Sequence, residues 1–203
     1  MELHDEIEHL TRYTLHELAV CVTIAAVAKE SAKTYFKDTL EPVNEETKKL
    51  LDKIDVALFL EDSDTLISKW VFINFVAIYE AWTSDILRAI LRKYPQKLKK
   101  EKEELRGILY GGPKGVTKRL QEITSIEMGN IPELAEVIRL KAVRDILLHN
   151  KGIVNKTYLR KSGDTKATEG DKIKTDAHFL LVNCCIFNSF VIKVSDELVK
   201  KYK

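Results

Sequence analysis

Residues from about Thr65 to Tyr94 repeat apolar side chains at the spacing of an α-helix, without a break. This length and periodicity predict a helix at the centre of the core, ended by Pro95. Asp62-Ser63-Asp64 precede it and resemble a helix start signal. The side chains expected in the core are Ile67, Trp70, Val71, Phe75, Ile78, Trp82, Ile86 and Ile90.

Apolar residues recur at helical spacing in five further segments. We therefore expect helices over residues 5–40, 44–55 and onward, 116–126, 132–150 and 175–201. Residues 155–175 are polar and are predicted to form a loop, and no strand is expected. The chain has only 8 Gly and 4 Pro, too few for the many tight turns of an all-β fold. The sequence predicts an all-α bundle of about five or six helices in a single domain, residues 1–203.

Charge is distributed unevenly, although the formal net charge is only +2. Residues 1–62 contain 14 acidic and 7 basic side chains, net −7, whereas residues 88–119 contain 3 acidic and 11 basic side chains, net +8. Such a basic segment can bind a polyphosphate chain, but a solvated lysine-rich arm shows the same pattern. We expect residues 88–127 to form a charged inserted arm and loop. Its candidate RNA-binding residues are Lys97, Lys99, Lys100, Lys102, Lys114, Lys118 and Arg119.

The cysteines and the N-terminus predict where the protein resides. Cys21, Cys184 and Cys185 lack the spacing of a disulfide framework, and the adjacent pair lies in an apolar helical pattern that favours core packing. The N-terminus is acidic where a secretory signal is basic. The longest apolar run, Leu18 to Ala28, is too short to span a bilayer. These features predict a soluble cytoplasmic protein with no membrane partner.

The stretch with the clearest chemical content lies at the end of the helix predicted over residues 132–150. Asp145 and His149 are four residues apart and share a helix face, so the carboxylate can orient the imidazole and raise its basicity. Arg144 lies about 100° from Asp145 around the helix, and its guanidinium can fork onto phosphate oxygens. A general base and a fixed cation are what RNA cleavage by its own 2′-hydroxyl requires, without a metal ion or other cofactor.

Neighbouring residues have both functional and structural interpretations. Asn150 either holds the scissile phosphate or His149, or caps the helix. Glu80 has apolar helical neighbours and should be partly buried, which calls for a partner. Arg144 is one possible partner, which would make Glu80 a supporting residue, and a solvated position at the edge of the apolar stripe is the other interpretation. The histidines lack the spacing of a zinc site, and no metal site is predicted.

Arg144-Asp145 and His149, with four intervening residues, resemble the R-x4-6-H motif of nucleases of the HEPN family (higher eukaryote and prokaryote nucleotide-binding domains). The flanking His149-Asn150-x-Gly152-x-Val154 and the later Gly170-Asp171-x-Ile173 are similar to the residues after the motif in the RiboL-PSP-type, defence-associated branch. The resemblance covers about residues 62–203. It implies a HEPN-like helical domain.

The resemblance also implies an activity and partners. It implies a metal-independent endoribonuclease that leaves a 2′,3′-cyclic phosphate, acting as a homodimer whose two motifs face each other across a shared cleft. A toxin or phage-defence effector of this kind is expected to have an inhibitor or antitoxin. Lys151 stands where some HEPN toxins carry a tyrosine that a partner nucleotidyltransferase modifies, which argues against that kind of antitoxin. The alternative is a non-catalytic HEPN module for RNA binding or protein assembly.

Overall fold

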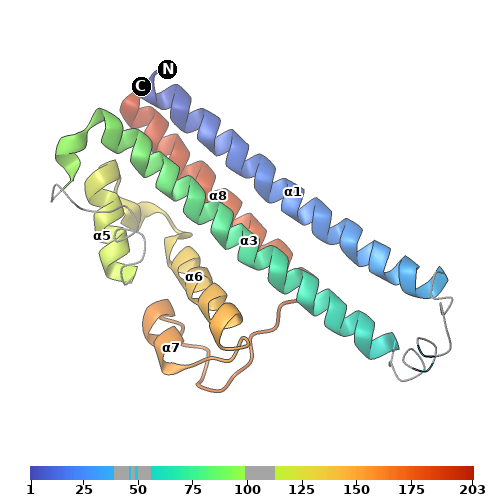
Figure 1. Ribbon diagram of the computed structural model, residues 1–203. Helices are drawn as coiled ribbons and strands as arrows, with labels where there is room; N and C mark the ends of the chain where they lie inside the picture. The colour runs from blue at the N-terminus through green and yellow to red at the C-terminus, as the bar shows by residue number, and fades with distance from the viewer. Residues whose placement is uncertain (39–45, 47–48, 50–55, 99–112) are drawn as a thin grey trace.

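Three long helices form the body of the protein. The computed structural model describes residues 1–38, 46, 49, 56–98 and 113–203. The long helices are α1 (Leu3–Asp38), α3 (Val56–Lys93) and α8 (Ala177–Tyr202). They pack side by side, with α1 running opposite to α3 and α8, and both chain termini lie at one end of the bundle (Figure 1).

Shorter elements cover one side of the long helices. They are the 3-10 turn η1 (Pro95–Lys97), α5 (Pro113–Thr124), the 3-10 turn η2 (Met128–Asn130), α6 (Leu134–His149) and α7 (Lys156–Ser162). Helix α6 packs on α3 and α8, α7 packs on α6, and α5 packs on α3. The described residues thus form six α-helices and no strand beyond an isolated bridge, which confirms the predicted all-α bundle.

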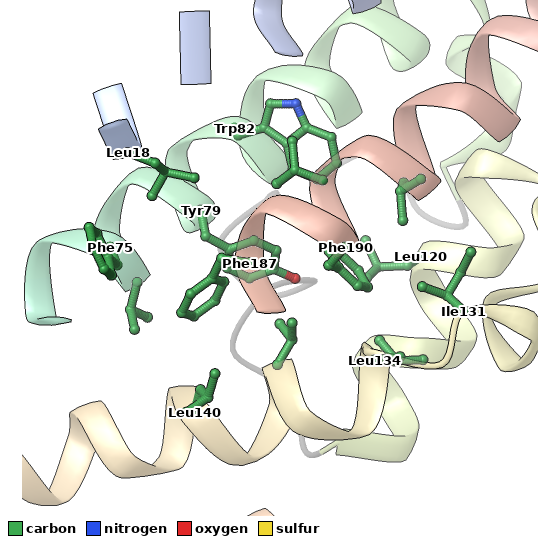
Figure 2. Close-up of a cluster of buried hydrophobic side chains, with 14 of the residues drawn as sticks. Leu18, Phe75, Tyr79, Trp82, Leu120, Ile131, Leu134, Leu140, Phe187 and Phe190 are labelled. Atoms are coloured by element: carbon green, nitrogen blue, oxygen red, sulfur yellow. The ribbon is translucent and has the colours of Figure 1, made fainter. Parts of the chain in front are cut away.

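The core is centred on aromatic side chains where α3, α6 and α8 meet. The Tyr79 ring lies 5.4 Å from the ring of Phe187 and 5.6 Å from that of Phe190, measured between centroids. Figure 2 shows these rings with side chains from α5 and α6 around them. The three rings are buried. Together they supply the large apolar area that a bundle of this size needs to hold its helices in register.

Polar side chains join α1 to this core. The Thr11 hydroxyl donates a hydrogen bond to Ser195 Oγ at 2.9 Å, and the Trp82 indole donates to Thr11 Oγ1 at 3.3 Å. All three residues are buried. Because buried polar groups are costly unless paired, this chain of bonds fixes where α1 lies against α3 and α8.

Helix α3 differs from the prediction in its start and in one core residue. It begins at Val56, so Asp62-Ser63-Asp64 do not start it. The apolar residues 56–60 continue the helical pattern upstream of these polar residues, so the backbone has no reason to leave the helix there. Trp70 was expected in the core but is 55% exposed. On a helix that is apolar nearly all round, periodicity does not decide which edge faces solvent.

The structure also corrects two predictions in the C-terminal half. Residues 155–175 contain α7, whose N-terminus is capped by the Asn155 side chain, which accepts a hydrogen bond from Tyr158 N–H at 2.9 Å. Gly163, with φ +67°, ends the helix. Cys184 is buried as expected, whereas Cys185 is exposed, because adjacent residues of a helix point in different directions.

The segment expected to form a charged arm is partly packed into the bundle. Residues 88–93 end α3, and residues 113–124 form α5, close to the helix predicted over residues 116–126. Leu120 and Ile123 of α5 are buried, so the expectation of an arm does not hold for these parts. Residues 99–112, with Lys99, Lys100 and Lys102, lie outside the described residues, as do the side chain of Lys114 and most of the helix predicted from Asn44.

Two of the described helices are long and apolar enough to cross a membrane, judged by length and composition: Leu3–Ser31 within α1, and α8. Core helices of soluble proteins pass the same test. In this fold, Leu18 of α1 and Phe187 of α8 are buried against other helices.

We predict that the turn after α6 requires a glycine at position 152. Gly152 has φ +79°, and an added Cβ would lie 3.1 Å from Leu147 Cδ2. Gly152→Ala should lower the free energy of unfolding by about 1–3 kcal/mol in urea denaturation, from backbone strain and crowding. Gly129→Ala is the matched control, because a Cβ there meets nothing within 4 Å. Equal losses in the two variants would contradict this account.

Candidate functional site

Arg144 of α6 is held by Glu80 of α3. Its Nη2 atom donates hydrogen bonds to Glu80 Oε1 at 2.7 Å and Oε2 at 2.8 Å. The Arg144 and Glu80 side chains are only 17% and 14% exposed. Of the two interpretations of Glu80, the contact with Arg144 is therefore confirmed and the solvated position is wrong.

A second cation shares the same carboxylate. The Lys141 ammonium lies 3.4 Å from Glu80 Oε1, one helical turn before Arg144. Burial lowers the pKa of Lys141, and the negative charge of Glu80 opposes that shift only in part. One carboxylate thus faces two cations in a partly buried position, which leaves the cluster with an excess of positive charge.

Asp145 does not pair with His149 as the sequence suggested. Its carboxylate lies 3.3 Å from Lys161 Nζ of α7 and 3.5 Å from Arg144 Nη1. Among the described residues, no hydrogen bond or ion pair joins Asp145 to His149. The pairing was expected from the four-residue spacing alone. The unpredicted helix α7 places Lys161 against this carboxylate instead.

His149 is the last residue of α6, and its side chain is exposed. No hydrogen bond or ion pair holds its imidazole within the part of the chain that the structure describes. Arg144 and His149 are five residues apart, which corresponds to roughly 140° around the helix and about 7.5 Å along it. The guanidinium faces α3, whereas the imidazole of the last helical residue is exposed to solvent.

Asn150 has a structural role in the turn after α6. Its backbone N–H donates to Ile146 C=O at 2.9 Å, and its side-chain amide donates to Ile153 C=O at 2.6 Å. The first bond satisfies a carbonyl at the helix terminus, and the second ties the turn to the residues after it. The capping interpretation of Asn150 is therefore confirmed, and its contact with a phosphate stays a prediction.

The two segments that carry the flanking part of the motif lie together. Val154 N–H donates to Asp171 C=O at 2.8 Å, and Ile173 N–H donates to Gly152 C=O at 2.9 Å. These bonds surround the isolated antiparallel bridge between Ile153 and Lys172. The short ribbon fixes the chain directly after His149 to the segment that leads into α8.

Lys97 is committed to contacts within the protein, contrary to the role in RNA binding that was expected for it. Its ammonium donates to Ile123 C=O and Ser125 Oγ, both at 2.7 Å, and lies 5.9 Å from the centre of the Tyr202 ring. Burial, followed by the charge of Lys201, lowers the pKa of Lys97. The ammonium holds the end of α5 against the end of α8.

Arg119 is likewise buried, at 8% exposure, and its guanidinium pairs with Glu122 at 2.9 Å. It also donates to Lys97 C=O at 3.4 Å. This burial and pairing leave its side chain little access to RNA, and its expected role as an RNA contact stays a prediction. Lys118, the remaining candidate with a described side chain, is exposed on α5.

Sequence reasoning missed Lys141 and Lys161. The signal for Lys141 was its spacing of three residues before Arg144, which places both on one side of α6. Lys161 could have been found only through α7. The signals for that helix were the capping residue Asn155 and Gly163 at the opposite end.

No family model, curated protein or solved structure matches this chain. Within the described residues, no group of three or more His, Cys, Asp or Glu side chains is placed to hold a metal ion.

We predict that Glu80 stabilises the fold through its two cations. Glu80→Ala would leave Arg144 and Lys141 partly buried without their carboxylate, and should lower the free energy of unfolding by about 2–3 kcal/mol. The control is Glu136→Ala, which removes a more exposed carboxylate, 49% exposed and paired with Arg139 at 2.7 Å. That variant should lose less than about 1 kcal/mol. If Glu80→Ala lowers the free energy of unfolding no more than Glu136→Ala does, the ion pair between Arg144 and Glu80 does not stabilise the fold.

Proposed function

We propose that this chain is a metal-independent endoribonuclease of the HEPN type, in which Arg144 and His149 are the catalytic residues. The observation that carries the proposal is the pair of groups at the end of α6. One is a guanidinium fixed by Glu80, and the other is an exposed imidazole with no partner among the described residues. These are the cation and the proton acceptor that RNA cleavage requires.

In the proposed reaction, the neutral imidazole of His149 takes the proton of a ribose 2′-hydroxyl. The 2′-oxygen then forms a bond to the adjacent phosphorus as the bond from phosphorus to the 5′-oxygen breaks. The products are a 2′,3′-cyclic phosphate and a 5′-hydroxyl, which takes up a proton in place of the one removed. Arg144 stabilises the negative charge that builds on the phosphoryl oxygens.

The two groups leave α6 in different directions, and for this reason we propose a homodimer with a composite active site. A second copy whose α6 end faces the first would bring an imidazole to the guanidinium side of its partner. A twofold arrangement is the commonest form of soluble oligomer and repeats the same contact twice. Asp145 pairs with Arg144 and Lys161, and would help to position the Arg144 guanidinium in this site.

The cellular role follows from the activity. An endoribonuclease acting on cellular RNA would harm its host unless restrained, so we propose a toxin or phage-defence effector with an inhibitor or antitoxin. The absence of framework cysteines favours a cytoplasmic location.

One observation favours a second candidate, a non-catalytic HEPN module that binds RNA or mediates assembly. Both oxygens of Glu80 engage Arg144, and Asp145 is bound by Lys161 rather than by the imidazole. If these ion pairs persist when RNA is bound, the charged cluster would help to bind the RNA but would not activate His149 as a general base.

We predict that the purified protein cleaves RNA in the presence of EDTA and leaves 2′,3′-cyclic phosphate ends. His149→Ala and Arg144→Ala should each lower the rate by at least about 100-fold, because a general base or a charge-stabilising donor is lost. Gel analysis with mass spectrometry of the ends measures both. His149→Ala should keep the wild-type melting temperature, because the side chain is exposed. RNA binding without cleavage by the wild type would identify the non-catalytic module.

We also predict that the two inactive variants complement each other. In a mixed dimer of Arg144→Ala and His149→Ala, one of the two composite sites has both residues. Equal mixing after unfolding and refolding should restore roughly a quarter of the wild-type rate, since about half of randomly formed dimers are mixed. If each chain uses its own Arg144 and His149, mixing restores nothing, and the composite site is wrong.

A further inference from the structure

Basic side chains surround the end of α6 on a surface that the sequence did not indicate. Residues 150–176 carry seven basic and four acidic side chains. All seven basic side chains are exposed, and we define the basic surface by five of them. They are Lys151, Lys156, Arg160, Lys172 and Lys174. They come from the turn after α6, from α7 and from the ribbon, all of which lie beside the end of α6 (Figure 1).

The packing of α7 fixes the direction of two of these cations. Tyr158 is 1% exposed and its hydroxyl donates to Asp164 at 2.8 Å, so this side of α7 faces inward. Lys156 and Arg160 are four residues apart and share the opposite, exposed side. In the ribbon, Lys172 forms the bridge with Ile153, and Lys151 and Lys174 lie two residues away from it in the same two segments.

Three of the four acidic residues of this segment bind backbone N–H groups in its turns and at the start of α8, and the fourth, Glu169, is exposed. Asp164 accepts from the backbone N–H of Lys166 at 2.9 Å, Asp171 accepts from Thr168 N–H at 2.8 Å, and Asp176 caps α8 by accepting from Phe179 N–H. The five cations of the basic surface have no ion pair or hydrogen bond from their side chains to any described residue. Like charges placed together without partners repel one another, and an anion bound between them removes that cost.

The surface lacks the groups that read bases. Tyr158 is the only Phe, Trp or Tyr between positions 134 and 176, and its ring is buried. Base recognition on a single strand depends largely on stacking against exposed aromatic rings. A strand on this surface would therefore be held by its phosphates.

We propose that the basic surface binds the sugar–phosphate backbone of RNA next to His149, with little selectivity for base. This inference rests on the proposed function, because it takes RNA as the substrate of the same site. It replaces Lys97 and Arg119, which are committed to contacts within the protein, by cations that are free to meet a phosphate. The arrangement leads the strand past the imidazole, where a 2′-hydroxyl can be reached.

The test measures binding of a fluorescent single-stranded RNA in EDTA, in a His149→Ala background that prevents cleavage. Adding Lys156→Gln and Arg160→Gln should weaken binding about tenfold and make the dependence on salt shallower by about 1.4 in log–log slope. Oligo(U) and oligo(A) should bind within about threefold of each other. The matched control is Arg12→Gln with Lys200→Gln, which removes two exposed cations from the opposite end of the bundle and should change binding less than about twofold.

Equal weakening by the α7 pair and the control pair would overturn the inference, as would binding to anionic vesicles but not to RNA. Cleavage by the wild-type chain is measured in parallel to separate the two proposals. Binding that depends on Lys156 and Arg160 without cleavage keeps the basic surface and rejects the nuclease. Cleavage with unchanged binding in the α7 variant rejects only the basic surface.

Discussion

The fork between Arg144 and Glu80 fixes the rotation of α6 about its own axis. Apolar contacts hold α6 against α3 and α8, but hydrophobic burial has no direction and tolerates small rotations. The ion pair is directional, because Arg144 Nη2 lies 2.7 and 2.8 Å from the two oxygens of the Glu80 carboxylate, and a rotation of α6 would break these hydrogen bonds. Once Arg144 faces α3, His149, five residues later, must face away from it. The exposure of the imidazole is thus a consequence of the ion pair on the other side of the helix.

Cations in this chain serve two distinct purposes, and charge alone does not separate them. The Lys97 ammonium contacts one backbone carbonyl oxygen, one serine hydroxyl and two tyrosine rings, and so joins the ends of α5 and α8. Lys156 and Arg160 sit on the outer side of a short helix with no partner among the described residues. The difference is set by neighbours distant in sequence. A count of lysines therefore indicated residues 88–119, whereas the free cations with a place near His149 are on α7 and the ribbon.

The long helices could be predicted because each buries a continuous apolar face. Phe75 and Trp82 of α3 and Phe187 of α8 follow helical spacing and are buried. The site could be predicted in part for the same reason: with apolar neighbours on α3, Glu80 had to find a partner, and Arg144 was a candidate. Helix α7 could not be found from periodicity, because seven residues give too little pattern. Its capping residues, Asn155 and Gly163, are of types that also occur in loops. Because α7 was not predicted, its residue Lys161 could not be predicted as the partner of Asp145.

The same ion pair limits how Arg144 and His149 can act on one phosphate. If one copy used both by turning Arg144 away from α3, Glu80 would keep only Lys141 as a partner. Breaking a partly buried pair of this kind would cost up to about 2–3 kcal/mol, a large fraction of the stability of a domain. A second copy that brings its own imidazole to the fixed guanidinium avoids this cost, because neither fold has to change. The proposed homodimer is therefore compatible with both the ion pair between Arg144 and Glu80 and the proposed chemistry.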